Sequence, residues 1–587
     1  MKRTILAAAA ILISCLCHDT HACTGLYIGK KCSASGAVVI ARCNDFHPTT
    51  IMPYVEITEA MSNVPGRQVH GINGFTWDLP ATTFRYVSVP YPEISDYGVF
   101  ASVASNEHGL ALTATITGYY CQAAREADGD VPDGVAEETI PSILAPCCRT
   151  AREAIELMAR VIDEKGSAEQ NIIMVADQKE AWYMEMYSGH QYCAVKMPED
   201  MVAVFGNEFM LDTVDPKSKD VICSKDLFKL PAKKGFAVMD SNGRMNLRRT
   251  YQGDGRMYDF CHLRTWGGRR LLSPSTTGEY SHETYYPLFF RPDSKVSVAD
   301  AMRVFRDRYE GTPFNPETSG NDEYRVIGDE AQEEVHIVEV YDNLPADMAC
   351  VTWLSLSEAA HAPFIPLSNA ITSCTPAYGL CAQEWGYTKG QAQHIYKRVN
   401  AFCANNRKIY SGGVKAYWKL IEDHMLPEFQ GVLAKAAALH ASDPAASAAL
   451  LTEYSNAVQA ECIADAERLF DDLVWHMMNF TQTNPYGSNF TTLVNRPSPM
   501  PVFDARVDVA RVAQWKGWDC VTDAAEKSLT LTRAGKTIKL TAAGPHRRSL
   551  GTASFSEADG SVREDPAAAS WFDGKVFLPL SVISILD

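Results

Sequence analysis

Cys23 is the residue of this sequence whose surroundings point most directly to chemistry. Residues 1–22 have the order of an export signal: a basic start, nine apolar residues from Ile5 to Ile13, and a small residue, Ala22, before the cut. Removal of this segment would make Cys23 the first residue, with a thiol pKa of about 8.5 and an α-amine pKa of about 7.7 to 8.0. The amine can take the thiol proton and later return it to a leaving amine. We therefore predict acyl transfer by an N-terminal cysteine.

A charged pair, Arg42 and Asp45, follows 19 and 22 residues after Cys23. If the strand-like stretches 23–30 and 36–43 form a hairpin, the end of the second returns to the start of the first. A guanidinium there favours the thiolate, and a carboxylate can hold the N-terminal ammonium. The alternative is a surface Arg–Asp pair at a strand end, and these residues alone favour neither interpretation.

The elements that must position these residues are mostly short strands in the first half of the chain. Runs rich in β-branched and aromatic residues predict strands at 99–105 and 109–117, and the four runs at 171–177, 181–187, 191–197 and 201–207 predict an antiparallel meander. A capping box, Thr150 to Glu153, predicts a helix that ends at Gly166, and a second box begins at Ser297.

The second half of the chain changes character. Residues 413–478 are rich in Ala, Leu, Glu and Lys and predict two long helices that turn at 442–444. Residues 484–501 are rich in Pro, Asn and Ser and predict a linker, and strand-like runs after it predict a small separate domain at 502–587. Strands followed by helices and further strands indicate an α+β protein.

Composition excludes several classes of function. Lys and Arg total 54 and Asp and Glu total 71, so the net charge is −17 and nucleic acid is not expected as a partner. We expect no transmembrane segment, because no uninterrupted apolar run reaches 18 residues. His282-Glu283 lacks the second histidine of a zinc helix, 534–537 lacks the first glycine of a phosphate loop, and no metal or cofactor is expected.

Several longer segments resemble one known family. CTGLYIGKKCSASGAVVIARCND at the start, SNEHGLALTAT (105–115), residues 182–209, FRDRYEGTPFNP (305–316) and residues 350–367 are similar to the secreted dipeptidases related to dipeptidase A. These are cysteine-type N-terminal nucleophile hydrolases, kin to choloylglycine hydrolases and penicillin V acylases. The likeness covers about residues 23–480, and the order and number of its segments make it specific.

The resemblance implies a four-layer αββα sandwich with a helical hairpin, and roles for individual residues. Cys23 would be the nucleophile and its amine the base, flanked by Arg42 and Asp45. Asn106 and Asn207 would bind the oxyanion, a role worth about 2.7 to 4 kcal/mol per donor in studied enzymes. The usual Arg-Asn-x-Asp reads Arg-Cys-Asn-Asp here, so Cys43 departs from the pattern. A further arginine of the amidase branch has no clear counterpart, with Arg264 as a candidate.

These implications predict a secreted or periplasmic cysteine dipeptidase that hydrolyses short peptides through a thioester, with residues 23–483 as its catalytic domain. Residues 502–587 resemble the small N-terminal domain of copper amine oxidases and imply an accessory domain, with contact to the cell envelope and a homo-oligomer as further hypotheses. One alternative is an amidase of the bile-salt or penicillin V type with the same machinery. Another is a non-catalytic cell-surface binding protein, for which lipidation at Cys15 would be the signature.

Overall fold

The structure, a computed structural model, describes residues 23–46, 52–92, 101–116, 120–252, 259–321, 324–383, 386–480, 506–542, 551–572 and 574–586. They form helices and strands in a mixed α and β fold, as the sequence predicts. The expected signal peptide 1–22 with Cys15, and the expected linker 484–501, lie outside the described residues.

The chain divides into two compact units. The first comprises Met1–Ala360 with Phe364–Lys397, and the second comprises His361–Pro363 with Arg398–Asp587. The helical region 413–478 thus falls in the second unit, together with the C-terminal strands. The predicted domains 23–483 and 502–587 stay a prediction.

A six-stranded antiparallel sheet in the first unit contains the segment with Cys23. Its strand order is β12-β1-β2-β14-β15-β16. The strands are β1 (Thr24–Ile28), β2 (Val38–Asp45), β12 (Val202–Phe205), β14 (Gln332–Val340), β15 (Cys350–Leu356) and β16 (Ile365–Ser368).

An eight-stranded antiparallel sheet in the same unit has the order β13-β11-β10-β9-β8-β7-β6-β3. Its strands are β3 (Glu56–Thr58), β6 (Tyr86–Pro90), β7 (Ala101–Asn106), β8 (Ala111–Ile116), β9 (Asn171–Ala176), β10 (Ala181–Met186), β11 (Tyr192–Lys196) and β13 (Val221–Cys223). A separate hairpin pairs β4 (Gln68–His70) with β5 (Thr76–Asp78).

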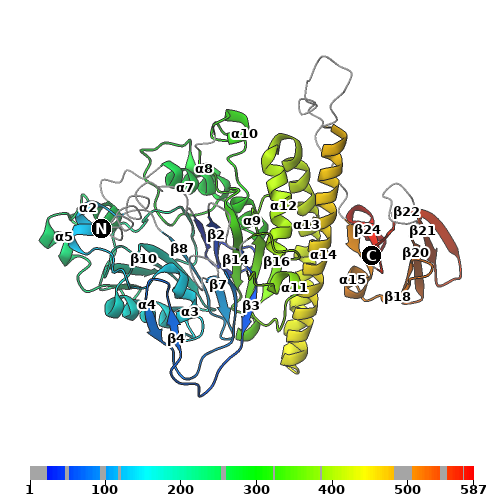
Figure 1. Cartoon of the computed structure of the whole chain (residues 1–587), viewed down its shortest axis with the longest axis horizontal. Helices are drawn as coiled ribbons and strands as arrows, with labels where there is room; N and C mark the ends of the chain where they lie inside the picture. Colours follow the sequence, from blue (N-terminus) through cyan, green and yellow to red (C-terminus); the bar gives the residue numbers. More distant parts are fainter. Residues whose placement is uncertain are drawn as a thin grey trace, which may run out of the picture. The chain divides into compact units, whose positions relative to one another are not determined.

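The two sheets face each other, and helices cover their other faces (Figure 1). Strand β2 contacts β8 and β9, and the Tyr183 ring of β10 packs edge to face on Phe205 of β12 at 5.3 Å. Helices α7 (Asp259–Leu272) and α9 (Val298–Phe305) lie on β12 and β14. Helices α3 (Ile140–Leu144) and α4 (Ala151–Lys165) lie on the eight-stranded sheet. Strand β2, with neighbours on both sides, is buried along its whole length.

The predicted hairpin between 23–30 and 36–43 is confirmed. Thr24 pairs with Cys43 and Ile28 with Val39 in the antiparallel register of β1 and β2. The predicted four-strand meander is wrong in its last member, because β12 leaves the eight-stranded sheet and pairs with β1, Gly25 opposite Phe205. A Cβ at Gly25 would lie 2.3 Å from the Phe205 ring, so glycine permits this close packing.

The predicted helix after Thr150 is also confirmed. Helix α4 ends at Gly166, which has a positive φ of 73°, and the Thr150 side chain accepts a hydrogen bond from the Glu153 amide. The Glu153 carboxylate accepts from the Arg149 amide, so only half of the expected box forms at Thr150 itself. Both halves of the box form at Ser297, the N-cap of α9.

Shorter helices connect these elements in the first unit. They are α2 (Gln122–Ala127), η1 (Glu137–Thr139), α5 (Lys229–Lys234), α6 (Leu247–Gln252), α8 (Pro274–Thr277), α10 (Pro316–Ser319), η2 (Ala346–Met348) and α11 (Pro376–Gly379). Helix α12 (Ala392–Asn405) spans the boundary between the two units.

The second unit contains the predicted helical hairpin, α13 (Arg407–His440) and α14 (Pro444–Phe480). Helix α15 (Val509–Trp515) follows β17 (Arg506–Asp508), and Arg511 of α15 forms ion pairs with Glu428 and Glu461 at 3.1 and 2.6 Å. Two small sheets complete the unit, β17-β24-β23 and β18 to β22 in sequence order. Their strands are β18 (Asp519–Asp523), β19 (Ser528–Arg533), β20 (Lys536–Thr541), β21 (Gly551–Ser556), β22 (Val562–Ala567), β23 (Ser570–Phe572) and β24 (Lys575–Pro579), before η4 (Leu580–Leu586).

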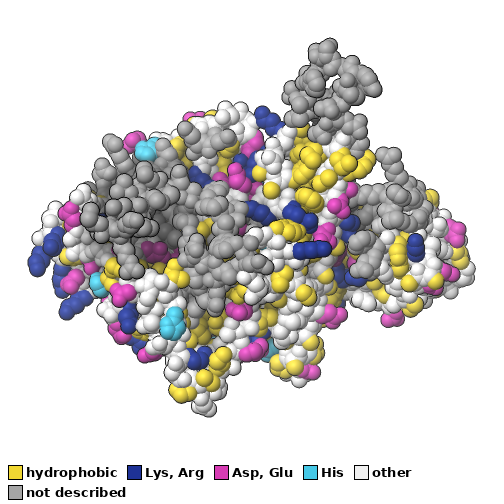
Figure 2. Space-filling view, in the orientation of Figure 1, with side chains coloured by type: hydrophobic (Ala, Val, Ile, Leu, Met, Phe, Trp, Pro, Cys, Tyr) yellow, Lys and Arg dark blue, Asp and Glu magenta, His cyan; other side chains and the backbone are white. Residues whose placement is uncertain are grey.

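The surface carries charges of both signs. Figure 2 shows Lys and Arg side chains interspersed with Asp and Glu over the visible face. Among the described residues, no helix combines the length and the apolar character needed to cross a membrane.

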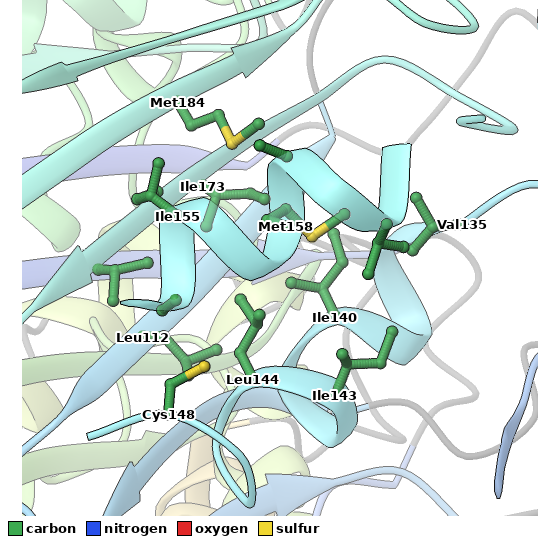
Figure 3. Close-up of a cluster of buried hydrophobic side chains, with 14 of the residues drawn as sticks. Leu112, Val135, Ile140, Ile143, Leu144, Cys148, Ile155, Met158, Ile173 and Met184 are labelled. Atoms are coloured by element: carbon green, nitrogen blue, oxygen red, sulfur yellow. The ribbon is translucent and has the colours of Figure 1, made fainter. Parts of the chain in front are cut away.

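The core beneath α4 is a cluster of aliphatic and sulfur-containing side chains (Figure 3). Ile155 and Met158 of α4 contribute to it from the helix, and Leu112, Ile173 and Met184 from the sheet. Cluster residues recur at alternate positions of a strand, as Ile173 and Val175 do in β9, which places them on one apolar face of this sheet.

We expect Met158→Ala to lower the free energy of unfolding by about 2 to 5 kcal/mol, because the buried side chain leaves a cavity in a packed core. Urea denaturation of the purified protein measures this. Glu164→Ala, at an exposed position of the same helix, is the control and should change stability by less than about 0.5 kcal/mol. Equal effects of the two substitutions would contradict the packing described here.

Candidate active site

Cys23 lies immediately before β1, opposite the end of β2. Because Thr24 pairs with Cys43, the next position of β2, Asn44, lies beside Cys23. The Cys23 thiol donates to Asn44 Oδ1 at 3.5 Å, and Cys23 is buried. The predicted return of the second strand to the start of the first therefore brings polar groups to this sulfur.

Arg42 lies close to the thiol, as the hairpin predicts. Its Nη2 atom is 3.6 Å from Cys23 Sγ and donates to Asn44 Oδ1 at 2.8 Å. Arg42 and Asn44 are two residues apart on β2, so both side chains lie on the face toward the other sheet, where Arg42 Nη1 contacts the Ser102 carbonyl at 3.4 Å. A buried cation at this distance favours the thiolate form of Cys23.

Asp45 lies on a different side of β2 from Arg42, since the two are three positions apart in a strand. Its Oδ2 atom accepts from Arg325 Nη2 at 2.8 Å, while Oδ1 is buried and has no donor within ordinary hydrogen-bond geometry among the described residues. Burial raises the pKa of Asp45, although Arg325 beside it acts in the opposite direction. The described partner of Asp45 is thus Arg325, which the sequence analysis did not identify.

Asn207 reaches the site because β12 pairs with β1 instead of with the meander. It follows β12 by two residues, and its Oδ1 atom accepts from Arg264 Nη2 at 2.9 Å. This contact fixes the orientation of the amide, with its oxygen toward Arg264 and its NH2 group turned away from it. An amide NH2 held in this way is a suitable donor to a negatively charged oxygen.

Arg264, which the sequence offered only as a candidate, lies directly at the site. The Nη1 atom of this buried guanidinium donates to the backbone carbonyl of Cys23 and to Thr24 Oγ1, the latter at 3.1 Å. Helix α7 carries it there by packing closely on β12, where a Cβ at Gly268 would lie 2.3 Å from Val204 Cγ1. This contact spans 241 residues, and no local pattern in the sequence marks it.

Asn106, the other asparagine predicted to bind the oxyanion, has hydrogen-bond partners within the fold at both ends of its side chain. Its Nδ2 atom donates to the backbone carbonyls of Ala145 and Cys148, both at 2.8 Å. Its Oδ1 atom accepts from the amides of His108 and Leu110, at 3.0 and 3.3 Å. Both amide hydrogens are therefore used within the fold, and none remains for an oxyanion.

The contacts of Cys43 explain how a cysteine is accommodated where the family pattern has an asparagine. The Thr24 amide donates to Cys43 Sγ at 3.2 Å, and burial raises the pKa of the Cys43 thiol well above its usual range. Cys43 therefore stays a neutral thiol within the sheet. Asn44 supplies the polar side chain instead, donating to Ser102 Oγ at 3.1 Å and to the Tyr91 hydroxyl.

Glu137 is a further residue that the sequence analysis missed. It begins the short helix η1, and its Oε1 atom lies 2.7 Å from Arg42 Nη2. Both side chains are buried, with exposures of 3% and 1%. Burial raises the pKa of Glu137 to about 8, against the opposing effect of Arg42.

Two other titratable residues, Glu185 and His190, form hydrogen bonds within the fold. The Glu185 carboxylate accepts from the backbone amides of Met210 and Leu211 and from the Tyr183 hydroxyl. His190 is half exposed and contacts Asp128 at 3.0 Å. Within the described ranges, no group of three or more His, Cys, Asp or Glu side chains is placed to hold a metal ion.

We expect Asn106→Ala to lower the free energy of unfolding by at least about 1 to 3 kcal/mol, since it leaves buried backbone groups without partners. Turnover per folded molecule should stay close to that of the unmodified protein. Urea denaturation and assays below the unfolding transition measure the two quantities. A selective loss of turnover at unchanged stability would show instead that Asn106 acts as an oxyanion donor.

The chain is similar in sequence to known proteins over much of its length. The profile described as Peptidase family C69 matches residues 22–419. "Probable dipeptidase B" of Streptococcus pyogenes serotype M1 is 32% identical over 375 residues, which cover 61% of this chain and 74% of that protein. "Probable dipeptidase" of Salmonella dublin is 29% identical over 360 residues, 60% of this chain and 82% of that protein. A solved variant of conjugated bile acid hydrolase from Clostridium perfringens aligns with a TM-score of 0.27 at 9% identity, over 63% of this chain and 98% of the other.

Proposed function

Because the chain belongs to peptidase family C69 and is a peptide-bond hydrolase, we propose that it is a cysteine dipeptidase with Cys23 as its nucleophile. The observation that carries this proposal is the contact of Cys23 Sγ with the buried guanidinium of Arg42 at 3.6 Å. Asn207, just after the other strand neighbour β12, adds a fixed amide, and Arg264 of helix α7 adds a second cation.

The proposal includes the maturation and the fold. The export signal 1–22 is removed, so that the mature chain starts at Cys23 and works outside the cytoplasm, as a secreted or periplasmic protein. The two facing sheets with helices on their outer faces then correspond to the αββα sandwich of N-terminal nucleophile hydrolases. Residues 502–587 form an accessory domain.

In the proposed reaction, the α-amine of Cys23 takes the thiol proton, and Arg42 stabilises the resulting thiolate. The sulfur attacks the scissile carbonyl and forms a carbon–sulfur bond, while the Asn207 NH2 group donates to the developing oxyanion. The carbon–nitrogen bond then breaks, and the departing amine takes the proton from the Cys23 ammonium. Water, deprotonated by the same α-amine of Cys23, then forms a carbon–oxygen bond to the thioester carbonyl; the carbon–sulfur bond breaks, the acyl half leaves as an acid, and the sulfur takes the proton back from the ammonium.

Asp45 and Arg264 would hold the reacting residue in place. The buried Oδ1 atom of Asp45 is an acceptor that suits the new ammonium of Cys23. Arg264 donates hydrogen bonds to both the Cys23 carbonyl and Asn207 Oδ1, so that one guanidinium positions the nucleophile and the proposed oxyanion donor. Such support keeps the reacting groups oriented before the substrate arrives.

We expect Cys23→Ser to lower kcat for a dipeptide by at least about a thousandfold, since loss of a protease nucleophile costs up to about 10⁶. Cys32→Ser, nine residues further in the same hairpin, is the matched control and should retain activity. Iodoacetamide should inactivate the unmodified protein and the control alike.

The identity of the first residue is measured on the same preparations by mass spectrometry of the mature chain. A mature chain that begins elsewhere and still cleaves its substrate would falsify the proposed mechanism. A panel of dipeptides, conjugated bile acids and acyl homoserine lactones separates the dipeptidase from an amidase with the same nucleophile.

We expect Asn207→Ala to lower kcat by about 10² to 10³ with little change in KM, because an oxyanion donor acts mainly in the transition state. Steady-state kinetics with a dipeptide measures this, and Asn106→Ala is the matched control. A change confined to KM would show that Asn207 binds the ground state of the substrate instead.

A further inference from the structure

The Nη2 atom of Arg42 lies within reach of two acidic groups at once. It is 2.7 Å from Glu137 Oε1 and 3.6 Å from Cys23 Sγ. Glu137 enters from η1 and Cys23 from the start of β1, so elements far apart in the sequence bring both acids to one cation. Asn44 Oδ1, at 2.8 Å from the same nitrogen, is neutral and leaves the charge balance unchanged.

The surroundings of this cluster are buried and rich in acidic groups. Glu334 of β14 and the Tyr91 hydroxyl face Arg42, and Glu138 and Glu169 face Glu137. The backbone amide of Glu137 donates to the Glu169 carboxylate at 2.6 Å. His336 of β14, opposite Arg42 in the sheet, contacts Glu334 with 3.1 Å between Nδ1 and Oε2. Among the described residues named here, a second negative charge beside Arg42 would meet no further guanidinium group, and the low polarity of the interior makes such a charge costly.

One cation with two acidic neighbours favours a single negative charge between them, provided that Cys23 has the role proposed above. We propose that Glu137 and Cys23 are alternative anionic partners of Arg42 and share one proton, which makes Glu137 a positioning residue that controls thiolate formation. When the thiol proton goes to the α-amine of Cys23, the Glu137 carboxylate takes up a proton from water, and when the sulfur is neutral the carboxylate carries the charge. The summed charge of the Arg42, Glu137 and Cys23 side chains is therefore conserved.

The state of Glu137 fits this exchange. Its pKa is raised by burial to about 8, so the carboxyl group takes up and releases a proton in the range in which thiols do. The two acids then titrate as a coupled pair, and thiolate appears in two steps spread over a wide pH range. The ionised carboxylate delays the thiolate because it already neutralises Arg42.

The test is the pH dependence of iodoacetamide alkylation at Cys23 in the mature protein, measured by mass spectrometry. We expect two steps for the unmodified protein. In Glu137→Gln the charge of Arg42 is available to the sulfur alone, so the profile should become a single step at lower pH. A shift of about one unit corresponds to about tenfold faster alkylation on the acidic limb.

Two further variants separate a charge effect from a loss of structure. Glu138→Gln removes an equal charge from the adjacent buried position and leaves the contact with Arg42 intact, so its profile can move along the pH axis but should keep two steps. Glu137→Asp keeps the charge and should restore the two steps. The acidic limb of kcat/KM for a dipeptide should move in parallel with alkylation.

A measurement on the unmodified protein covers the case in which Glu137→Gln does not fold. Alkylation of Cys23 removes the competing anion, so Glu137 should ionise, and the difference infrared spectrum should lose a protonated carboxyl band. The proposal is overturned by an unchanged infrared band, or by a Glu137→Gln alkylation profile that coincides with that of the unmodified protein.

These readouts do not depend on turnover. If Cys23→Ser retained hydrolysis, the proposed function would fail while the alkylation result still reported on the Arg42 cluster. If Cys23 proved essential but its profile did not respond to Glu137→Gln, only the role of Glu137 would fail.

Discussion

Two buried guanidinium groups, those of Arg42 and Arg264, impose the main constraint on the surroundings of Cys23. A buried guanidinium is stable only when hydrogen-bond acceptors surround it, so each arginine bonds to oxygen atoms from several elements. Arg42 contacts the side chains of Glu137 and Asn44, and Arg264 contacts the Cys23 carbonyl and the Asn207 side chain. The groups proposed for catalysis are thus held in place by the need to satisfy two charges.

Local pattern was sufficient to predict the hairpin and its consequence. The β-branched and aromatic residues in 23–30 and 36–43 predict two strands, and an antiparallel hairpin returns the end of the second strand to the start of the first. Arg42 therefore lies at Cys23 in the structure as in the prediction. The same pattern predicts less about Asp45, because a spacing of three in a strand turns the two side chains to different faces, and Arg325 takes the carboxylate.

The remaining parts of the site depend on contacts between distant segments, which local pattern does not encode. Residues 201–207 look like the last strand of a meander, but β12 pairs with β1 in the other sheet, where Phe205 packs on Gly25 and Asn207 follows the strand. Glu137 lies in a three-residue helix without a motif. Asn106 matches a family motif in sequence, yet its side-chain NH2 group donates to two backbone carbonyls in the fold.

Strand β2 lies between β1 and β14, and both of its faces are covered. A strand in this position tolerates substitutions between side chains of similar shape, but it does not tolerate a change in its length. An insertion or deletion of one residue within Val38–Asp45 would turn every later side chain to the opposite face, and the guanidinium of Arg42 would move away from the sulfur. Length variation among related chains is therefore expected in the turn 29–37, while the eight positions of β2 evolve by substitution alone.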